Sequence, residues 1–228
     1  MADNAYTFGD QLDLLSILLG DPNTTDDDMF PLAIRKTYIN RGEIHFAVDS
    51  KSMREYATGA IASQEISLPS NWIKTHVLVV NAIDVASMEV ALQDYDRYLN
   101  SGDYHWYQWE VSGTEKIAFL STSVNGLTYK LWYFKKPTTA LSALADVSII
   151  PIEFREASVY WAASELMKQI GKTDLASQYL AVYAAFVQAA SDDAKKKYMD
   201  RVNPNVDAGV DAGSSQSQVD IEGRGYTY

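Results

Sequence analysis

The 228-residue sequence contains no cysteine, only three histidines, and fewer basic than acidic residues. Without cysteine, disulfide frameworks, thiolate zinc sites and cysteine nucleophiles are excluded, and a cytosol-like compartment is expected. The 19 lysines and arginines stand against 30 aspartates and glutamates, which gives a formal net charge of -11. This balance excludes a nucleic-acid binder that relies on a phosphate-neutralising surface. No hydrophobic run approaches the roughly 20 apolar residues that cross a bilayer, so no membrane span is expected.

Motifs for metal ions, nucleotides and catalysis are equally scarce. His45, His76 and His105 lie in separate segments and are not spaced to share a helix face, so we predict no metal site. Residues 171–173, Gly-Lys-Thr, resemble the end of a phosphate-binding loop, yet they follow a helical pattern where that loop requires a strand. Neither a nucleophile elbow nor a dinucleotide-binding glycine pattern is present. We therefore predict no cofactor and no enzymatic activity.

The first fifty residues have the periodicity of two helices. A short helix is predicted over residues 10–19, with Gly20 at its end. A longer helix is predicted to begin near Pro31, capped by the acidic run 26–28, and to reach about residue 47. Its apolar and aromatic residues recur every three or four positions, as is typical of one helix face: Phe30, Ile34, Tyr38, Arg41, His45 and Val48.

The middle of the chain changes to the composition of β-strands. Strands are predicted over residues 56–68, 72–80, 104–111, 116–120 and 127–134, separated by turn-forming residues. Asn125-Gly126 is the strongest short-range signal for a hairpin in this region. The segment 88–99 is ambiguous, and a short helix is one interpretation of it.

The helical period returns after Pro151, and the predicted fold class is α+β. One helix is closed by Gly171 and the next begins near Asp174, so the two form an α-hairpin. We expect a mainly helical core of four segments in residues 1–50 and 150–202, with an antiparallel β insertion in residues 51–149. Residues 203–228 are rich in Asp, Gly, Ser and Gln and are predicted to form a disordered or extended tail.

Aromatic side chains concentrate in residues 104–109 and recur at Trp132. In a strand, this segment places aromatic rings on both faces, so both faces would be covered. We therefore favour a role in the core or in a subunit interface over a platform that stacks sugars or bases. The interface candidates are Trp106, Tyr107, Trp109 and Trp132.

Several short motifs occur in a fixed order between residues 10 and 200. They are Leu-Gly-Asp-Pro at 19–22, Ile-Asn-Arg-Gly at 39–42, Ile-Ser-Leu-Pro at 66–69 with Trp-Ile at 72–73, Trp-Tyr-Phe-Lys-Lys-Pro at 132–137, Ile-Pro-Ile-Glu-Phe at 150–154, and Tyr-Leu-Ala-Val-Tyr at 179–183. In this order they resemble the head-to-tail adaptor, or head-completion, proteins of tailed bacteriophages. The resemblance covers most of the chain.

The resemblance implies a structural virion protein at the head–tail junction, assembled in the host cytoplasm. Such adaptors form a ring, expected to be a 12-mer, that binds the portal protein, extends the DNA channel and docks tail or nozzle proteins. Double-stranded DNA would pass through this channel without specific binding, which suits an acidic protein. Candidates for the channel lining are Asp26, Asp27 and Asp28, although helix capping explains these residues equally well.

The polar tail ends in a few apolar groups that a partner surface would bury. These candidate portal-binding anchors are Val219, Ile221, Tyr226 and Tyr228. A competing hypothesis is a carbohydrate- or ligand-binding module of a virion or surface structure, built around Trp106, Trp109 and Trp132.

Overall fold

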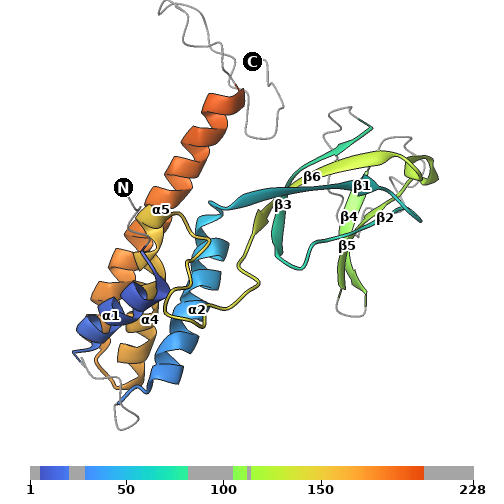
Figure 1. The fold of residues 1–228 in the computed structure, drawn as a ribbon. Helices are drawn as coiled ribbons and strands as arrows, with labels where there is room; N and C mark the ends of the chain where they lie inside the picture. The colour runs from blue at the N-terminus through green and yellow to red at the C-terminus, as the bar shows by residue number, and fades with distance from the viewer. Residues whose placement is uncertain (1–5, 21–28, 82–104, 112–113, 203–228) are drawn as a thin grey trace, which may run out of the picture. The chain divides into compact units, whose positions relative to one another are not determined.

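The computed structural model describes residues 6–20, 29–81, 105–111 and 114–202 (Figure 1). The chain divides into two compact units. The helical unit comprises the described residues of 1–53 and 134–201, and the β unit those of 54–133. The expected α+β class is confirmed. Residues 136–149, expected in the β insertion, lie in the helical unit, where Leu141 and Ser142 bond to α2 and Leu144 and Asp146 accept bonds from α1.

The helical unit contains α1 (Phe8–Leu19), α2 (Leu32–Ser50), α4 (Glu156–Gln169) and α5 (Thr173–Val202). The four expected helical segments are therefore present. α4 lies between α2 and α5 (Figure 1), and it also packs against α1. Ser164 of α4 donates its hydroxyl to the Ala176 carbonyl of α5 at 2.9 Å, which joins the expected α-hairpin. The core of this unit is apolar and includes Phe8, Leu12, Leu15, Ile39, Val159, Ala162, Leu166 and Met167.

Local sequence explains how α1 begins and how α1 and α4 end. Thr7 and Asp10 form a reciprocal capping box at the start of α1, and Gly20 ends this helix in the left-handed conformation at φ 69°. Gly171 has φ 76° between α4 and α5, as its predicted capping role requires. The expected acidic cap of α2 is wrong, because Pro31 is the N-cap residue and the helix has no side-chain cap there.

The apolar stripe that indicates α2 meets the core only in part, since Phe30 and Tyr38 pack in or against it but the rest of the stripe does not. The buried face of α2 is instead formed by Arg35, Ile39, Gly42, Glu43, Phe46, Ala47 and Ser50. Ile34 and Val48 of the expected stripe are exposed by 40% and 39%. The inversion arises because Arg35 and Glu43 find hydrogen-bond partners on neighbouring segments, and a partnered polar group can be buried.

The β unit consists of two three-stranded sheets. One has the order β1-β6-β3, from β1 (Arg54–Ala60), β6 (Thr128–Lys135) and β3 (Trp72–Val80). The other has the order β2-β5-β4, from β2 (Glu65–Ser67), β5 (Thr114–Phe119) and β4 (Trp106–Val111), and is antiparallel. Their shared core includes Ile61, Ile66, Leu78, Val80, Trp106, Ile117, Phe119 and Leu131.

Two expectations for the β unit are wrong. The single strand predicted over residues 56–68 is two strands, interrupted where Ser63 and Gln64 adopt positive φ values of 52° and 62°. Asn125-Gly126 does not close a hairpin, since β5 and β6 lie in different sheets. Its polar groups bond elsewhere: Gly126 donates to the Ile61 carbonyl, and Asn125 Oδ1 accepts from the Gln64 amide at 2.6 Å. The ambiguous segment 88–99 lies outside the described residues.

Candidate interaction surfaces

Several of the sequence-predicted site residues lie outside the described residues. These are the candidate channel-lining residues Asp26, Asp27 and Asp28, and the candidate anchors Val219, Ile221, Tyr226 and Tyr228. Their roles stay predictions. Among the described residues, no group of His, Asp and Glu is arranged to hold a metal ion. In the same part of the chain, none of the helices has both the length and the apolar character that a bilayer span demands.

The aromatic candidates of the β unit divide into one core residue and three residues nearer the surface. Trp106 is only 5% exposed and packs in the core of its own unit. On the other face of β4, Trp109 is 37% exposed and its ring centroid lies 6.2 Å from that of Tyr107. Trp132 is half-buried, with the Lys130 ammonium 4.6 Å from its ring centroid. Trp106 is therefore not accessible to a ligand in the way that the hypothesis of a stacking platform built on Trp106, Trp109 and Trp132 requires.

An irregular segment of the helical unit, residues 136–151, crosses the surface of α1 and α2, and we call it the strap. Asn40 of α2 bonds twice to the backbone of Leu141, at 2.7 and 3.0 Å. Lys36 Nζ donates to the Ser142 carbonyl at 2.8 Å. The Asp146 carboxylate accepts from the Ser142 and Ala143 amides, and these bonds lower its pKa. The strap is held by hydrogen bonds in place of a helix or sheet ladder.

The strap also accepts hydrogen bonds from the first turn of α1. The Phe8 amide donates to the Asp146 carbonyl at 2.8 Å, and the Gly9 amide donates to the Leu144 carbonyl at 2.9 Å. First-turn amides of a helix have no partner within that helix, so outside carbonyls must satisfy them. The strap and α1 therefore depend on each other for their backbone hydrogen bonds.

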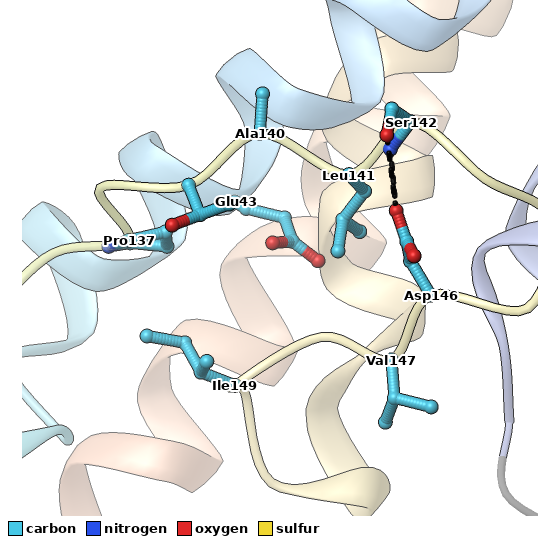
Figure 2. Close-up of a pocket in the computed structure, with 9 residues that line it drawn as sticks. Glu43, Pro137, Ala140, Leu141, Ser142, Asp146, Val147 and Ile149 are labelled. Atoms are coloured by element: carbon cyan, nitrogen blue, oxygen red, sulfur yellow. Dashed lines mark hydrogen bonds between the residues drawn. The ribbon is translucent and has the colours of Figure 1, made fainter.

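Between the strap and α2 lies an open pocket of about 380 Å³, into which the Glu43 side chain points (Figure 2). Glu43 is 2% exposed, and its carboxylate accepts a bond from Gln11 Nε2 at 3.4 Å. Gln11 Nε2 also donates to Ser158 Oγ and to the Arg155 carbonyl. Burial raises the pKa of the Glu43 carboxyl, against the opposing effects of hydrogen bonds from Ser148 and Gln11 and of the Arg155 charge.

We expect the substitution Glu43→Gln to raise the melting temperature at pH 7. A raised folded-state pKa means that the folded protein holds the Glu43 proton more tightly than the unfolded chain. Stability therefore falls as the pH rises from the unfolded pKa of about 4.3 through the folded value, and the loss persists above it. Glutamine carries no charge, so it avoids this loss. It also supplies a donor near Gln11 Oε1, which is buried without a hydrogen-bond partner among the described residues.

Melting curves of the wild type and the Glu43→Gln variant between pH 4 and pH 8 test this expectation. The difference between the two proteins should shrink toward pH 4, where the wild-type carboxyl becomes protonated. Asp146→Asn is the matched control, and we expect it to lower the melting temperature at pH 7. The expected direction is opposite because hydrogen bonds lower the pKa of Asp146. A Glu43→Gln variant that is less stable than the wild type at pH 7 would show that the ionised carboxylate is needed.

Exposed apolar side chains gather on the strap and just beyond it. Leu144, Val147 and Ile149 are exposed by 60%, 44% and 54%, and Ile152 by 52%. Figure 2 shows Val147 and Ile149 on the part of the strap that follows Asp146. Exposed apolar patches commonly mark contact sites for other proteins, so these side chains are candidates for such a site.

The outward face of α2 is a second uncovered surface. Its exposed residues are Ala33, Ile34, Thr37, Arg41, Ile44, His45, Val48 and Asp49. Beside it, the His45 ring stacks on Trp161 of α4 at a centroid distance of 4.3 Å. The Arg41 guanidinium lies 5.4 Å from the Tyr38 ring centroid. This combination of Trp, Tyr and Arg is typical of the residues that dominate protein–protein binding energies.

The outward face of α5 is a third uncovered surface, and the sequence analysis missed it. No charged residue occurs from residue 175 to residue 191, although this stretch forms most of a surface helix. Leu175, Leu180 and Val182 are exposed by 36%, 40% and 38%. The alanines at 181, 184, 185 and 189 are also exposed. The lack of charged residues from 175 to 191 is the sequence signal that could have indicated this surface, because such a run is unusual for a solvated helix face.

These features describe an α+β protein with several surfaces of exposed apolar and aromatic side chains. A family model described as SU10 adaptor protein matches residues 6–208, and the chain belongs to this family. The membership agrees with the resemblance to phage head-to-tail adaptors, and it makes the chain a structural adaptor protein of a phage. No protein with a curated description matches the chain.

Proposed function

We propose that this protein is a head-to-tail adaptor that binds the portal as a ring, extends the DNA channel and docks tail proteins. The match to the adaptor family over residues 6–208 is the observation that carries the proposal. The role is structural and requires no chemistry, so the protein would act by contact alone. Its place would be the head–tail junction of the virion.

The charge of the chain suits a channel through which DNA moves. Each subunit carries a formal charge of -11, and the negative potential of a ring grows with every copy. Phosphates are repelled by such a surface, so it cannot trap the DNA by neutralising it. We propose Asp26, Asp27 and Asp28 as residues that face this channel.

Contact with the portal and with neighbouring subunits is assigned to different parts of the chain. We propose that Val219, Ile221, Tyr226 and Tyr228 anchor the protein to the portal. Tyr107, Trp109 and Trp132 are proposed as subunit contacts of the β unit. Trp106 is omitted from that contact, because it packs inside its own unit.

We expect the full chain to form rings on the portal protein of the same phage. Purified adaptor and portal are mixed, and the complexes are sedimented and imaged by electron microscopy. Removing residues 203–228 should weaken portal attachment and leave the melting temperature of the folded part unchanged, because all of the described core lies before residue 203. If the full chain does not bind the portal under any salt condition, the proposed function is wrong. If the truncated chain binds the portal as well as the full chain does, the proposed anchors are wrong but the proposed function is not.

A further inference from the structure

Two uncovered faces of the helical unit point away from each other. α2 approaches α4 through Gly42, next to Ser158, and α5 meets α4 through Ala176, next to Ser164. Since α4 lies between the two helices (Figure 1), the outward faces of α2 and α5 are on opposite flanks of the unit. Among the described residues, the α2 face is met only along one edge, where Tyr183 bonds to Asp49 and Trp161 stacks on His45.

Both faces have few charges in a strongly acidic protein. The outward face of α5 has none between residues 175 and 191. The outward face of α2 carries only Arg41 and Asp49, and the Asp49 carboxylate already accepts a bond from the Tyr183 hydroxyl at 2.6 Å. Two copies with a charge of -11 each repel one another over most of their surfaces. Copies that met through these two faces would approach without bringing many carboxylates together.

The two faces also differ in the size of their side chains. The α2 face carries Ile34, Ile44 and Val48, with His45 and its stacking partner Trp161 beside them. The α5 face is dominated by alanine, with exposed methyl groups at 181, 184, 185 and 189. Alanines allow another helix to approach closely, and large side chains then fill the space around them. A bulky face and an alanine-rich face are complementary in shape.

We propose that the outward face of α5 in one copy of this chain packs against the outward face of α2 in the next copy. The contact is head-to-tail, and it rests on the proposed ring, for which it names the contact between helical units beside that proposed for the β units. A head-to-tail contact covers both faces of every subunit and generates a ring when the rotation closes. A symmetric contact of α5 with α5 would leave every α2 face uncovered.

Cysteine cross-linking tests the pairing directly, because the chain has no cysteine of its own. One variant carries Val48→Cys on α2 and another carries Val182→Cys on α5, at side chains that are 39% and 38% exposed. The two variants are mixed and treated with a short bis-maleimide linker, with and without portal protein. We expect a cross-linked dimer in the mixture and none with either variant alone. A chain that carries both cysteines should give a ladder of larger products.

Ile17→Cys on α1 is the matched control, since Ile17 is an exposed apolar residue, at 72%, outside both faces. It should cross-link to neither partner. Cross-linking of Val182→Cys with itself would overturn the proposal in favour of a symmetric contact. Absence of a cross-link in the mixture, both alone and on the portal, would also overturn it. Portal binding is read separately by sedimentation, so the adaptor function can stand when the pairing fails.

A charge variant gives a second measurement. Ala185→Asp places a carboxylate in the middle of the uncharged α5 face, where we expect it to abolish the cross-link between copies. Ile17→Asp adds the same charge outside both faces and should leave the cross-linking yield unchanged. Equal yields for Ala185→Asp and the parent pair would count against the α5 face as the contact surface.

Discussion

Replacing Gly42 by alanine is expected to destabilise the helical unit by about 3 kcal/mol. A methyl group at this position would stand 2.4 Å from the Ser158 carbonyl oxygen and 3.0 Å from the Ser158 Cα. Both atoms belong to the backbone of α4, so relief requires that α2 and α4 move apart. In a helix, alanine is more favourable than glycine by about 1 kcal/mol, so the same substitution at a solvent-exposed helix position would stabilise the protein. Urea unfolding followed by the helical circular dichroism signal measures the difference.

Gly9→Ala in α1 is the matched control for this prediction. Its added methyl group would lie 3.3 Å from the Leu144 carbonyl of the strap, a contact that a small shift of the strap relieves. We expect a loss below about 1 kcal/mol for this variant. The double variant Gly42→Ala with Ser158→Gly should not recover stability, because the clash is with the backbone. A Gly42→Ala protein as stable as the wild type would show that α2 and α4 lie further apart.

Replacing Trp106 by alanine is expected to cost the β unit about 3–5 kcal/mol. Trp106 is 5% exposed and lies opposite Phe119 in the antiparallel register of β4 and β5. Its removal leaves a cavity between residues of the same core. Trp109→Ala removes an equally large side chain from a 37% exposed position and should cost much less. Hydrogen exchange of β-unit amides, read by mass spectrometry, reports each effect locally.

The comparison of the two tryptophan variants also distinguishes their roles in assembly. Trp109→Ala should lower the yield of rings on the portal at an unchanged stability of the β unit, since we propose Trp109 as a subunit contact. Trp106→Ala should mainly lower the stability of the β unit. Equal losses of amide protection in both variants would place Trp109 in the core as well, and would remove it from the proposed contact.

The structure gives physical roles to the residues of the Ile-Asn-Arg-Gly motif. Ile39 is fully buried in the helical core, and Asn40 fastens the strap through Leu141. Arg41 lies on the outward face against Tyr38, and Gly42 permits the close approach of α4. One turn of α2 therefore serves the core, the strap, the proposed contact surface and the helix crossing.

The sequence by itself determined the elements that depend on neighbouring residues. The four helices, the left-handed Gly20 and Gly171, and the strand over residues 72–80 follow from periodicity, capping and turn propensities that act within a few residues. The order of short motifs also indicated the adaptor family, which the family model over residues 6–208 supports. Composition determined the acidic, cysteine-free character on which the channel proposal and the cross-linking test depend.

Only the tertiary structure decided which face of α2 is buried. Both faces of this helix carry apolar residues, so periodicity alone favours the stripe with Ile34 and Val48. Arg35 is fully buried because the Phe30 carbonyl and Ser16 Oγ accept its hydrogen bonds, and Glu43 is buried beside Gln11. These partners are supplied by other segments, and a local pattern contains no information about them.

The strap and the sheet order were decided in the same way by distant partners. The strap has no helical or strand period, and its course follows from hydrogen bonds to Asn40, Lys36 and the first turn of α1. Asn125-Gly126 is a strong hairpin signal locally, yet its polar groups bond to Ile61 and Gln64, so β5 and β6 enter different sheets. Burial and long-range hydrogen bonds select among local conformations that the sequence permits, and they exist only once the chain has folded.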